Sequence, residues 1–377
     1  MKKNKATAGL YLHIPFCLQK CLYCDFCSFA GQDGDTHARY VERLCREIVD
    51  RAVSVGQLTF DTVYFGGGTP TLLSPDLLGR VLDTARTHLC ILPDAEVTVE
   101  CNPATADAAK LSLLREAGVN RLSIGLQSAD DGELRALGRA HTAKAAIETV
   151  RAARQAGFGN LSLDVMLGIP HQTRDSLDRT LDTLLSLSPE HISAYSLILE
   201  EGTPFYDARD TLPLPDEDTV VALTEQAFAT LAGAGYARYE ISNFARAGFE
   251  SRHNLHYWRM DDYLGVGIAA HSLIGRERLQ NRPDLAAYLD GEDITEREEL
   301  LSDEVARDEY VMLGLRLVEG IDKREFRERF GLEFDALYPA IKGYARMGLM
   351  LDTPDRAAFT DKGFAVSNAV LAEMLFN

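Results

Sequence analysis

The chain of 377 residues is 46% hydrophobic and 25% charged, a composition typical of a folded globular protein long enough for two domains. Its formal net charge of −18 argues against a basic surface that binds nucleic acid or an anionic membrane. No apolar stretch approaches the roughly 20 residues of a membrane-spanning helix, and His13 and Pro15 interrupt the segment that would form a signal-peptide core. We therefore expect a cytoplasmic protein without a membrane span, in which any membrane contact runs through a partner.

Apolar β-branched segments alternate with amphipathic helical segments over the first 200 residues, which predicts parallel strands joined by crossover helices. Helix-start signals at Ser74 and Thr173 and helix-ending glycines at 118 and 157 support this pattern. Six such units form either an open doubly wound sheet or a partial barrel, and both collect ligands at the carboxyl ends of the strands. The predicted strands cover residues 9–16, 61–67, 96–102, 120–128, 160–169 and 191–199.

The pattern changes after residue 201, where a proline-rich loop precedes a predicted helix from Asp216 to about Ala234. We place the main domain boundary near residue 235. Acidic residues outnumber basic ones in the last part of the chain, so a DNA-reading role is not expected there. That part, residues 301–377, resembles a winged helix, with predicted helices over 303–318, 322–330 and 335–347, a hairpin around 353–356 and a closing helix.

Four of the seven cysteines lie within eleven residues near the N-terminus. Cys17, Cys21 and Cys24 have the spacing C-x3-C-x2-C directly after the first predicted strand. Three thiolates on one loop suit an iron-sulfur cluster with one iron left free of protein ligands. The alternatives are a zinc knuckle with a distant fourth ligand, or cysteines buried in the core. Cys45 and Cys90 lie in predicted helices and are expected in the core.

A glycine-rich turn, Gly66 to Thr69, ends the second predicted strand. It lacks the Lys-Ser/Thr of a nucleotide-binding P-loop and does not match the G-x-G-x-x-G dinucleotide pattern. Together with the cysteine spacing and the aromatic Tyr23, this GGGTP turn resembles the radical S-adenosylmethionine (SAM) superfamily. The resemblance implies a 4Fe-4S cluster held by Cys17, Cys21 and Cys24 whose free iron binds SAM.

A more specific resemblance runs from about residue 9 to the C-terminus. The chain is similar to the oxygen-independent coproporphyrinogen oxidase-like family in the ordered segments HIPFC, CDF, YFGGGTPT, VTVECNP, RLSIGLQS, LGRAHT and LDVMLGIP. This resemblance implies an α/β fold with a partial (β/α)6 barrel over residues 1–235, a connecting segment over 236–300 and a winged-helix-like domain over 301–377. It also implies that the SAM contacts are Tyr11, Tyr23, Gly67, Gly68, Thr69, Glu100, Gln127, Arg139 and Asp164.

Cys27 stands three residues after Cys24 and could act as a fourth ligand, which would close the cluster to SAM. We expect a free thiol instead. The family's oxidases carry a substantial extension before the first strand and a cysteine two places after the third ligand. This chain has only eight residues before that strand and has Phe26 at that place, so both differences argue against oxidase activity.

The haem chaperone branch of this family carries the pattern H-N-x-x-Y-W, which is present here as residues 253–258 and includes the single tryptophan. By this resemblance haem is cargo for apoproteins such as respiratory enzymes, and His253, Tyr257 and Trp258 are the candidate haem contacts. The alternative for this segment is a packed aromatic hinge with a hydrogen-bonded histidine. The alternative for the whole protein is an oxygen-independent coproporphyrinogen III dehydrogenase or a related porphyrin-modifying enzyme.

Overall fold

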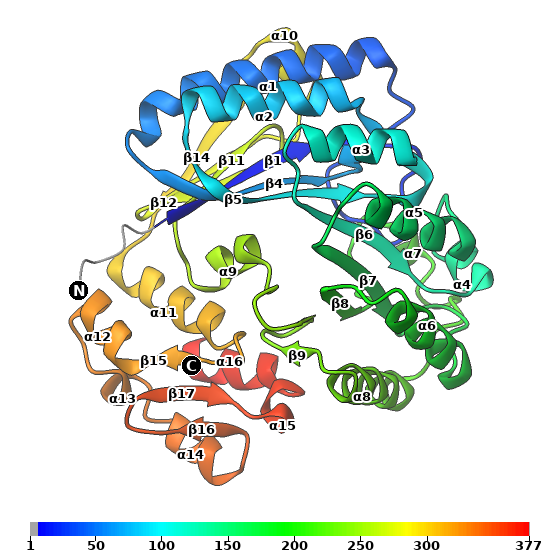
Figure 1. Ribbon diagram of the computed structural model, residues 1–377. Coiled ribbons are helices and arrows are strands. Elements are labelled where there is room, and N and C mark those ends of the chain that lie inside the picture. The colour runs from blue at the N-terminus through cyan, green and yellow to red at the C-terminus, as the bar shows by residue number, and fades with distance from the viewer. Residues whose placement is uncertain (1–6, 377) are drawn as a thin grey trace.

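The computed structural model describes residues 7–376, of which residues 297, 298 and 376 are described by their backbone alone. Six parallel strands curve into a partial barrel and follow one another in chain order without a reversal (Figure 1). A doubly wound sheet would reverse its order near the middle, so the partial barrel is confirmed. The six strands are β1 Thr7–Ile14, β4 Thr59–Gly67, β5 Cys90–Cys101, β6 Arg121–Gln127, β7 Leu161–Leu167 and β8 His191–Ser196.

Helices cover the outer face of this sheet. Ser74 accepts a hydrogen bond from the Leu77 amide at the start of α2, and Thr173 forms a capping box with Ser176 at the start of α6. Gly118 and Gly157 have φ values of 98° and 88° in the turns that follow α3 and α5. The outer helices are α1 Gly34–Val55, α2 Pro75–His88, α3 Ala108–Glu116, α5 Ala143–Gln155, α6 Arg174–Ser186 and α8 Glu217–Gly233.

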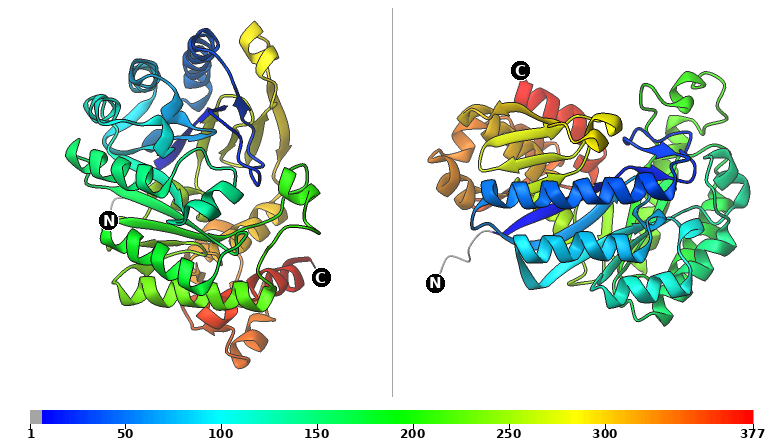
Figure 2. Two further views of the ribbon diagram at one scale, coloured as in Figure 1. Left: turned by 90° about the vertical axis from the view of Figure 1, so that its right-hand side faces the viewer. Right: turned by 90° about the horizontal axis from the view of Figure 1, so that it is seen from above.

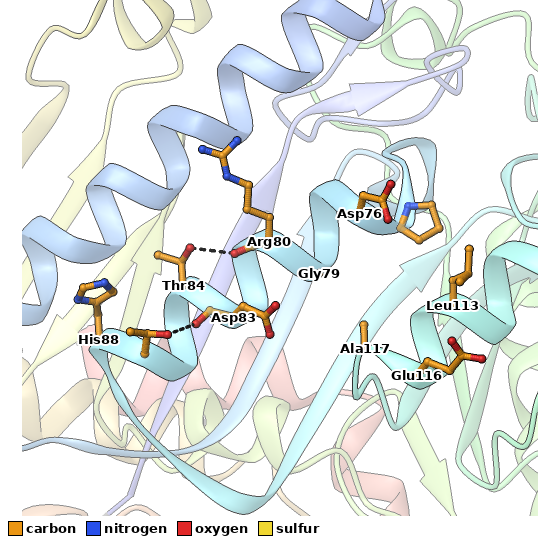
Figure 3. A pocket seen from close by; sticks show the side chains of 11 residues that line it. Asp76, Gly79, Arg80, Asp83, Thr84, His88, Leu113, Glu116 and Ala117 are labelled. Carbon is orange, nitrogen blue, oxygen red and sulfur yellow. Dashed lines mark hydrogen bonds between the residues drawn. The ribbon is translucent and has the colours of Figure 1, made fainter.

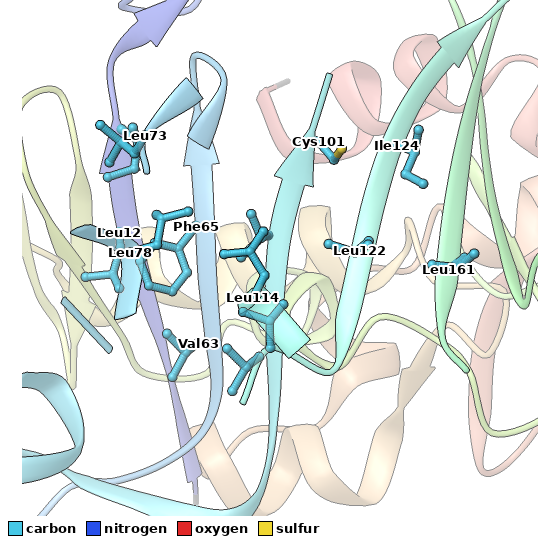
Figure 4. Packing of buried hydrophobic residues seen from close by; sticks show 14 of the residues in the cluster. Leu12, Val63, Phe65, Leu73, Leu78, Cys101, Leu114, Leu122, Ile124 and Leu161 are labelled. Atoms are coloured by element: carbon cyan, nitrogen blue, oxygen red, sulfur yellow. The ribbon is translucent and has the colours of Figure 1, made fainter. Parts of the chain in front are cut away.

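Alternate residues of each strand point to opposite faces of the sheet. On β1, Leu10 and Leu12 are fully buried under the helices, whereas Tyr11 points into the barrel and keeps some accessible surface. Figure 4 shows the apolar layer, in which Leu12, Phe65 and Leu122 are among the side chains directed at the helices. The inner face carries polar side chains, and the candidate functional site lies on this face.

Residues 236–300 extend the sheet at both ends. β11 pairs with β1 in parallel, and β12, β13 and β14 continue from it with antiparallel pairing, whereas β10 pairs with β8 at the other end, followed by β9. α9 lies on the concave side of the barrel, and α10 packs against α1 (Figures 1 and 2). These elements are β9 Ala237–Arg238, β10 Asn243–Ala245, α9 Arg252–Trp258, β11 Tyr263–Val266, β12 His271–Ile274, β13 Glu277–Asn281, α10 Leu285–Asp290 and β14 Thr295–Leu300.

The C-terminal region has its own hydrophobic cluster around Phe326 and Phe359, beside a three-stranded sheet. The single helix predicted over 335–347 is divided, because Pro339 disfavours helical backbone at Tyr338. The predicted hairpin is present. The elements are α11 Asp303–Gly314, β15 Ile321–Asp322, α12 Lys323–Phe330, α13 Phe334–Leu337, α14 Ile341–Arg346, β16 Met350–Asp352, β17 Arg356–Phe359, α15 Asp361–Phe364 and α16 Ser367–Phe376.

Candidate functional site

The loop with the three cysteines lies at the carboxyl end of β1, between the short paired strands β2 Phe16–Cys17 and β3 Phe29–Ala30. Cys17 ends β2, and Cys21 and Cys24 follow in a turn closed by a hydrogen bond from the Cys24 amide to the Cys21 carbonyl, 3.2 Å. All three side chains are half-buried. The Leu22 amide donates to the Leu137 carbonyl, 3.2 Å, which ties this loop to the far side of the barrel.

All three sulfur atoms already accept hydrogen bonds, that of Cys24 from the Phe26 amide. Thr69 donates to Cys17 Sγ over 3.6 Å, and a guanidinium nitrogen of Arg139 donates to Cys21 Sγ over 3.5 Å. Soft sulfur ligands with such donors fit a 4Fe-4S cluster. Within residues 7–376 no three His, Cys, Asp or Glu side chains converge closely enough to hold a metal as they stand.

Cys27 is anchored differently from the three candidate ligands. Its side chain packs against the hydrophobic core under the barrel helices, and burial raises the pKa of its thiol. Its carbonyl accepts a hydrogen bond from Nε2 of His13, 2.9 Å, and the Tyr11 hydroxyl lies 3.1 Å from Nδ1. Burial lowers the pKa of His13 to about 4, so the ring is neutral at pH 7. With its single proton on Nε2, His13 accepts from Tyr11 and links the barrel wall to the cysteine loop.

The glycine turn after β4 packs directly against the start of the cysteine loop. Gly67 has a φ of 108°, and a Cβ on Gly68 would lie 2.7 Å from the Phe16 carbonyl oxygen. The Gly68 amide donates to the Ile14 carbonyl, 2.9 Å, and the Thr69 amide to that of Phe16, 2.7 Å. Glycine is therefore required here, because only bare backbone fits between the turn and the loop.

Two carboxyl groups line the interior below this turn. Glu100, near the end of β5, accepts hydrogen bonds from the Tyr64 hydroxyl, 2.9 Å, and from the Gly67 backbone. Burial, with a smaller contribution from the nearby Asp164, raises the pKa of Glu100 to about 7. Burial also raises the pKa of Asp164 to about 6, against hydrogen bonds from serine hydroxyls. Asp164 lies in the middle of β7, three residues before this strand ends at Leu167.

Arg139 and Gln127 come together at β6, the strand that lies between β5 and β7. Arg139 spans from Cys21 to the Gly125 carbonyl on β6, 3.1 Å away. Gln127, at the end of β6 with a φ of 65°, accepts a hydrogen bond from the Tyr195 hydroxyl, 3.1 Å. Tyr23 packs beside these groups, and burial raises the pKa of its phenol. The predicted SAM contacts therefore form two linked groups, one around Glu100 and one around Arg139.

Sequence reasoning missed three residues of this interior: Tyr64, Tyr195 and Arg121. Tyr64 stands two positions before the glycine turn, where strand periodicity directs it into the barrel, and its hydroxyl binds Glu100. Tyr195 also points inward, from β8, where it lies opposite Met166 of β7. The alternation of each strand carried this signal, but it could not tell which face lines a cavity. Cys90 is a further correction, because it begins β5 and is exposed rather than helical and buried.

The three candidate haem contacts on α9 face different surroundings. His253 is 1% exposed, with Nδ1 2.7 Å from the Thr62 hydroxyl and Nε2 2.9 Å from the Tyr257 hydroxyl. Its ring stacks on Tyr64, and burial lowers the pKa of His253 to about 3. Trp258, half-buried at the other end of α9, lines a small cavity of about 50 Å³ against α11 and β15. The helix therefore joins the barrel interior to the C-terminal region.

A larger cavity, about 630 Å³, lies on the outside of the barrel between α2 and α3 (Figure 3). Polar residues such as Arg80, Asp83 and Glu116 line it. The apolar layer and the sheet separate it from the carboxylates of the interior, so it does not belong to the candidate site. None of the helices described between residues 7 and 376 has the length and apolar character needed to span a membrane.

Comparison with known proteins agrees with this geometry. The family model of the radical SAM superfamily matches residues 11–184, and that of the HemN C-terminal domain matches residues 301–366. In fold, the chain is similar to coproporphyrinogen III oxidase (HemN) from Escherichia coli, with a TM-score of 0.86 and 22% identity over 99% of this chain and 91% of that one.

Similarity in sequence to curated relatives extends over nearly the full length. The haem chaperone HemW of Bacillus subtilis is 38% identical over 97% of this chain and 98% of its own. The HemW of Escherichia coli is 34% identical over 96% of this chain and 97% of its own. Radical SAM membership implies a 4Fe-4S cluster and SAM as cofactors. The chain therefore belongs to the HemW family of haem chaperones within the radical SAM superfamily.

Proposed function

We propose that this protein binds haem and delivers it to haem-requiring apoproteins in the cytoplasm, respiratory enzymes among them. The observation that carries the proposal is the similarity to curated haem chaperones over nearly the whole of both chains. The α9 helix adds support, because one element holds the H-N-x-x-Y-W residues and contacts both the barrel and the C-terminal region. The acidic net charge supports apoproteins rather than nucleic acid as partners.

In this proposal Cys17, Cys21 and Cys24 hold the cluster, while the thiol of Cys27 stays in the core. When bound, the cluster supplies a one-electron centre with an open iron for SAM. The Arg139 guanidinium suits a carboxylate, and Glu100 and Asp164 suit hydroxyl donors or a cationic group. The other proposed SAM contacts are Tyr11, Tyr23, Gly67, Gly68, Thr69 and Gln127.

Haem contacts the α9 segment through His253, Tyr257 and Trp258 in this proposal. A neutral His253 that donates its Nδ1 proton to Thr62 keeps a lone pair on Nε2, which faces the Tyr257 hydroxyl. Iron ligation by Nε2 therefore requires the Tyr257 hydroxyl to move away, while the Thr62 bond still orients the ring. Haem binding and a small movement of α9 are coupled in this proposal.

The test is a haem titration of the anaerobically reconstituted protein, followed by transfer to an apo-cytochrome. Soret absorbance should saturate at a defined stoichiometry, and H253A should weaken haem binding about tenfold or more and shift the Soret band. H88A removes an exposed histidine on the outer face of α2 and should bind like the wild type. Absence of haem binding by a protein with an intact cluster would falsify the proposal.

The fold shared with HemN makes coproporphyrinogen III dehydrogenase the natural competing activity. Anaerobic incubation of the same preparation with coproporphyrinogen III, SAM and a reductant separates the two. Protoporphyrinogen formation over many turnovers would favour the dehydrogenase. SAM cleavage or binding without that product, together with haem transfer, would favour the chaperone.

A further inference from the structure

A buried arginine without a hydrogen-bonded partner on its Nε lies in the barrel interior. Arg121 is the first residue of β6, is 2% exposed and is the largest fully buried side chain in the described chain. A guanidinium so removed from water is costly unless opposite charge compensates it. Arg121 therefore requires negatively charged groups nearby on the inner face of the barrel.

Strand register brings two carboxyl groups close to Arg121. Arg121 pairs with Thr98 on β5, and two residues along, Ser123 pairs with Glu100. The rise of about 3.3 Å per strand residue puts these pairs one layer apart on the same inner face. Ser123 also hydrogen-bonds Asp164 from β7. Arg121 therefore lies one layer below Glu100 and two layers below Asp164 on the same inner face, and its positive charge acts on both carboxyl groups.

Few other charges reach these carboxyl groups. Burial raises the pKa of every tyrosine around them, so these phenols stay neutral at physiological pH. Arg139 faces Asp164 but is already hydrogen-bonded to Cys21 and to the Gly125 carbonyl. The titratable and charged groups that face Glu100 or Asp164 are Tyr11, Tyr64, Arg121, Arg139, Tyr195 and Tyr257.

We propose that Arg121 is a positioning residue for SAM, whose fixed positive charge keeps Glu100 and Asp164 ionised in the buried barrel so that they can bind the cofactor. The inference rests on the proposed SAM site and deepens it. Burial, with a smaller contribution from Asp164, holds the pKa of Glu100 at about 7; burial holds that of Asp164 at about 6, and the charge of Arg121 acts against both shifts. Without its charge, the pKa of each carboxyl group would rise further and a larger fraction of each would be protonated at neutral pH.

The test is the pH profile of SAM binding by the cluster-loaded protein, measured by equilibrium dialysis from pH 6 to pH 9.5. In R121Q the profile should move to higher pH by about one to two units. SAM affinity at pH 7 should fall about tenfold and return to near the wild-type value at pH 9. R121K keeps the charge and should restore the wild-type profile at neutral pH. Iron and sulfide content reports separately on the cluster.

A purely structural role for Arg121 would lower affinity equally at all pH values, and that result would overturn the inference. So would unchanged binding by R121Q at pH 7. If R121Q does not accumulate as folded protein, R121M takes its place, because its unbranched apolar side chain fills much of the same buried space without a charge; an unshifted pH profile in R121M also overturns the inference. A wild-type protein that binds no SAM contradicts the proposed SAM site itself, which is a different outcome from an altered pH profile.

Discussion

The two faces of the barrel sheet differ in the polarity of the side chains that they bury. The outer face carries fully buried aliphatic and aromatic side chains such as Leu12 and Val63, packed under helices. The inner face of the same strands carries Glu100, Arg121 and Asp164, whose burial opposes folding. Burial of the apolar outer face therefore stabilises the fold and offsets the cost of burying the polar side chains of the candidate site on the inner face.

The largest expected effect comes from the cysteine loop, which follows β1 at the edge of the barrel. Replacing Cys24 by alanine should abolish the 4Fe-4S cluster, because two thiolates on this loop cannot hold it. C27A is the matched control, since Cys27 packs against the core, and it should retain full iron and sulfide content with at most a modest loss of stability. Anaerobic absorption spectra and iron analysis check both. A cluster lost in C27A would make Cys27 a ligand.

Truncation on the outer face should affect stability alone. Phe65 is 1% exposed beneath the helices, and F65A should lower the free energy of unfolding by about 3–5 kcal/mol. Urea denaturation of the anaerobic protein measures this loss. SAM affinity of the remaining folded fraction should stay within about twofold of the wild type. A strong loss of SAM binding at low urea would contradict the division between the faces.

A substitution on the inner face should do the reverse. E100Q keeps an acceptor for Tyr64 but removes the charge, so SAM affinity should fall about tenfold. Because the folded-state pKa of Glu100 is about 7, above the usual 4.5, the wild type loses stability as pH rises from 4.5 to 7. E100Q should therefore unfold at the same or a higher temperature than the wild type at pH 8. A lower melting temperature there would contradict this reasoning.

The smallest expected effect concerns the ion pairs that hold α9 through His256. His256 lies 2.7 Å from Asp61 and 3.3 Å from Asp261, and although burial acts against it, these carboxylates raise the pKa of His256 to about 9. A histidine with a raised pKa stabilises the fold fully below pH 6.5 and loses that effect as pH rises through 9. The pKa of Asp61 is held at about 2, so its own effect disappears only when pH falls from about 4 through 2.

Thermal unfolding between pH 6 and pH 10 checks this. The melting temperature of the wild type should fall across the alkaline half of the range. D61N should have a lower melting temperature at pH 6, and its melting temperature should fall less as pH rises. D290N is the matched control, because Asp290 makes only an exposed 3.7 Å ion pair with Arg39, and it should follow the wild type. A D61N curve parallel to that of the wild type would show that the ion pair between Asp61 and His256 does not contribute to stability.

Local patterns in the sequence predicted what is local in the structure. The six barrel strands and the caps at Ser74 and Thr173 follow from residue type and periodicity. The pairing of β11 with β1 joins residues more than 250 positions apart, which no local period encodes. The hydrogen bond between Nδ1 of His253 and Thr62 also joins distant parts of the chain, whereas the bond to Tyr257 is local, within α9.

Strand β1 has a neighbour on each side, β4 from the early part of the chain and β11 from beyond residue 262. A chain emerging from a ribosome therefore carries β1 with one unpaired edge until Val266 has been made. The cysteine loop follows β1 directly, so it is among the first segments synthesised and among the last to be supported from both sides. The strand that leads into the cysteine loop is therefore completed on its second edge by a segment made long after the loop itself.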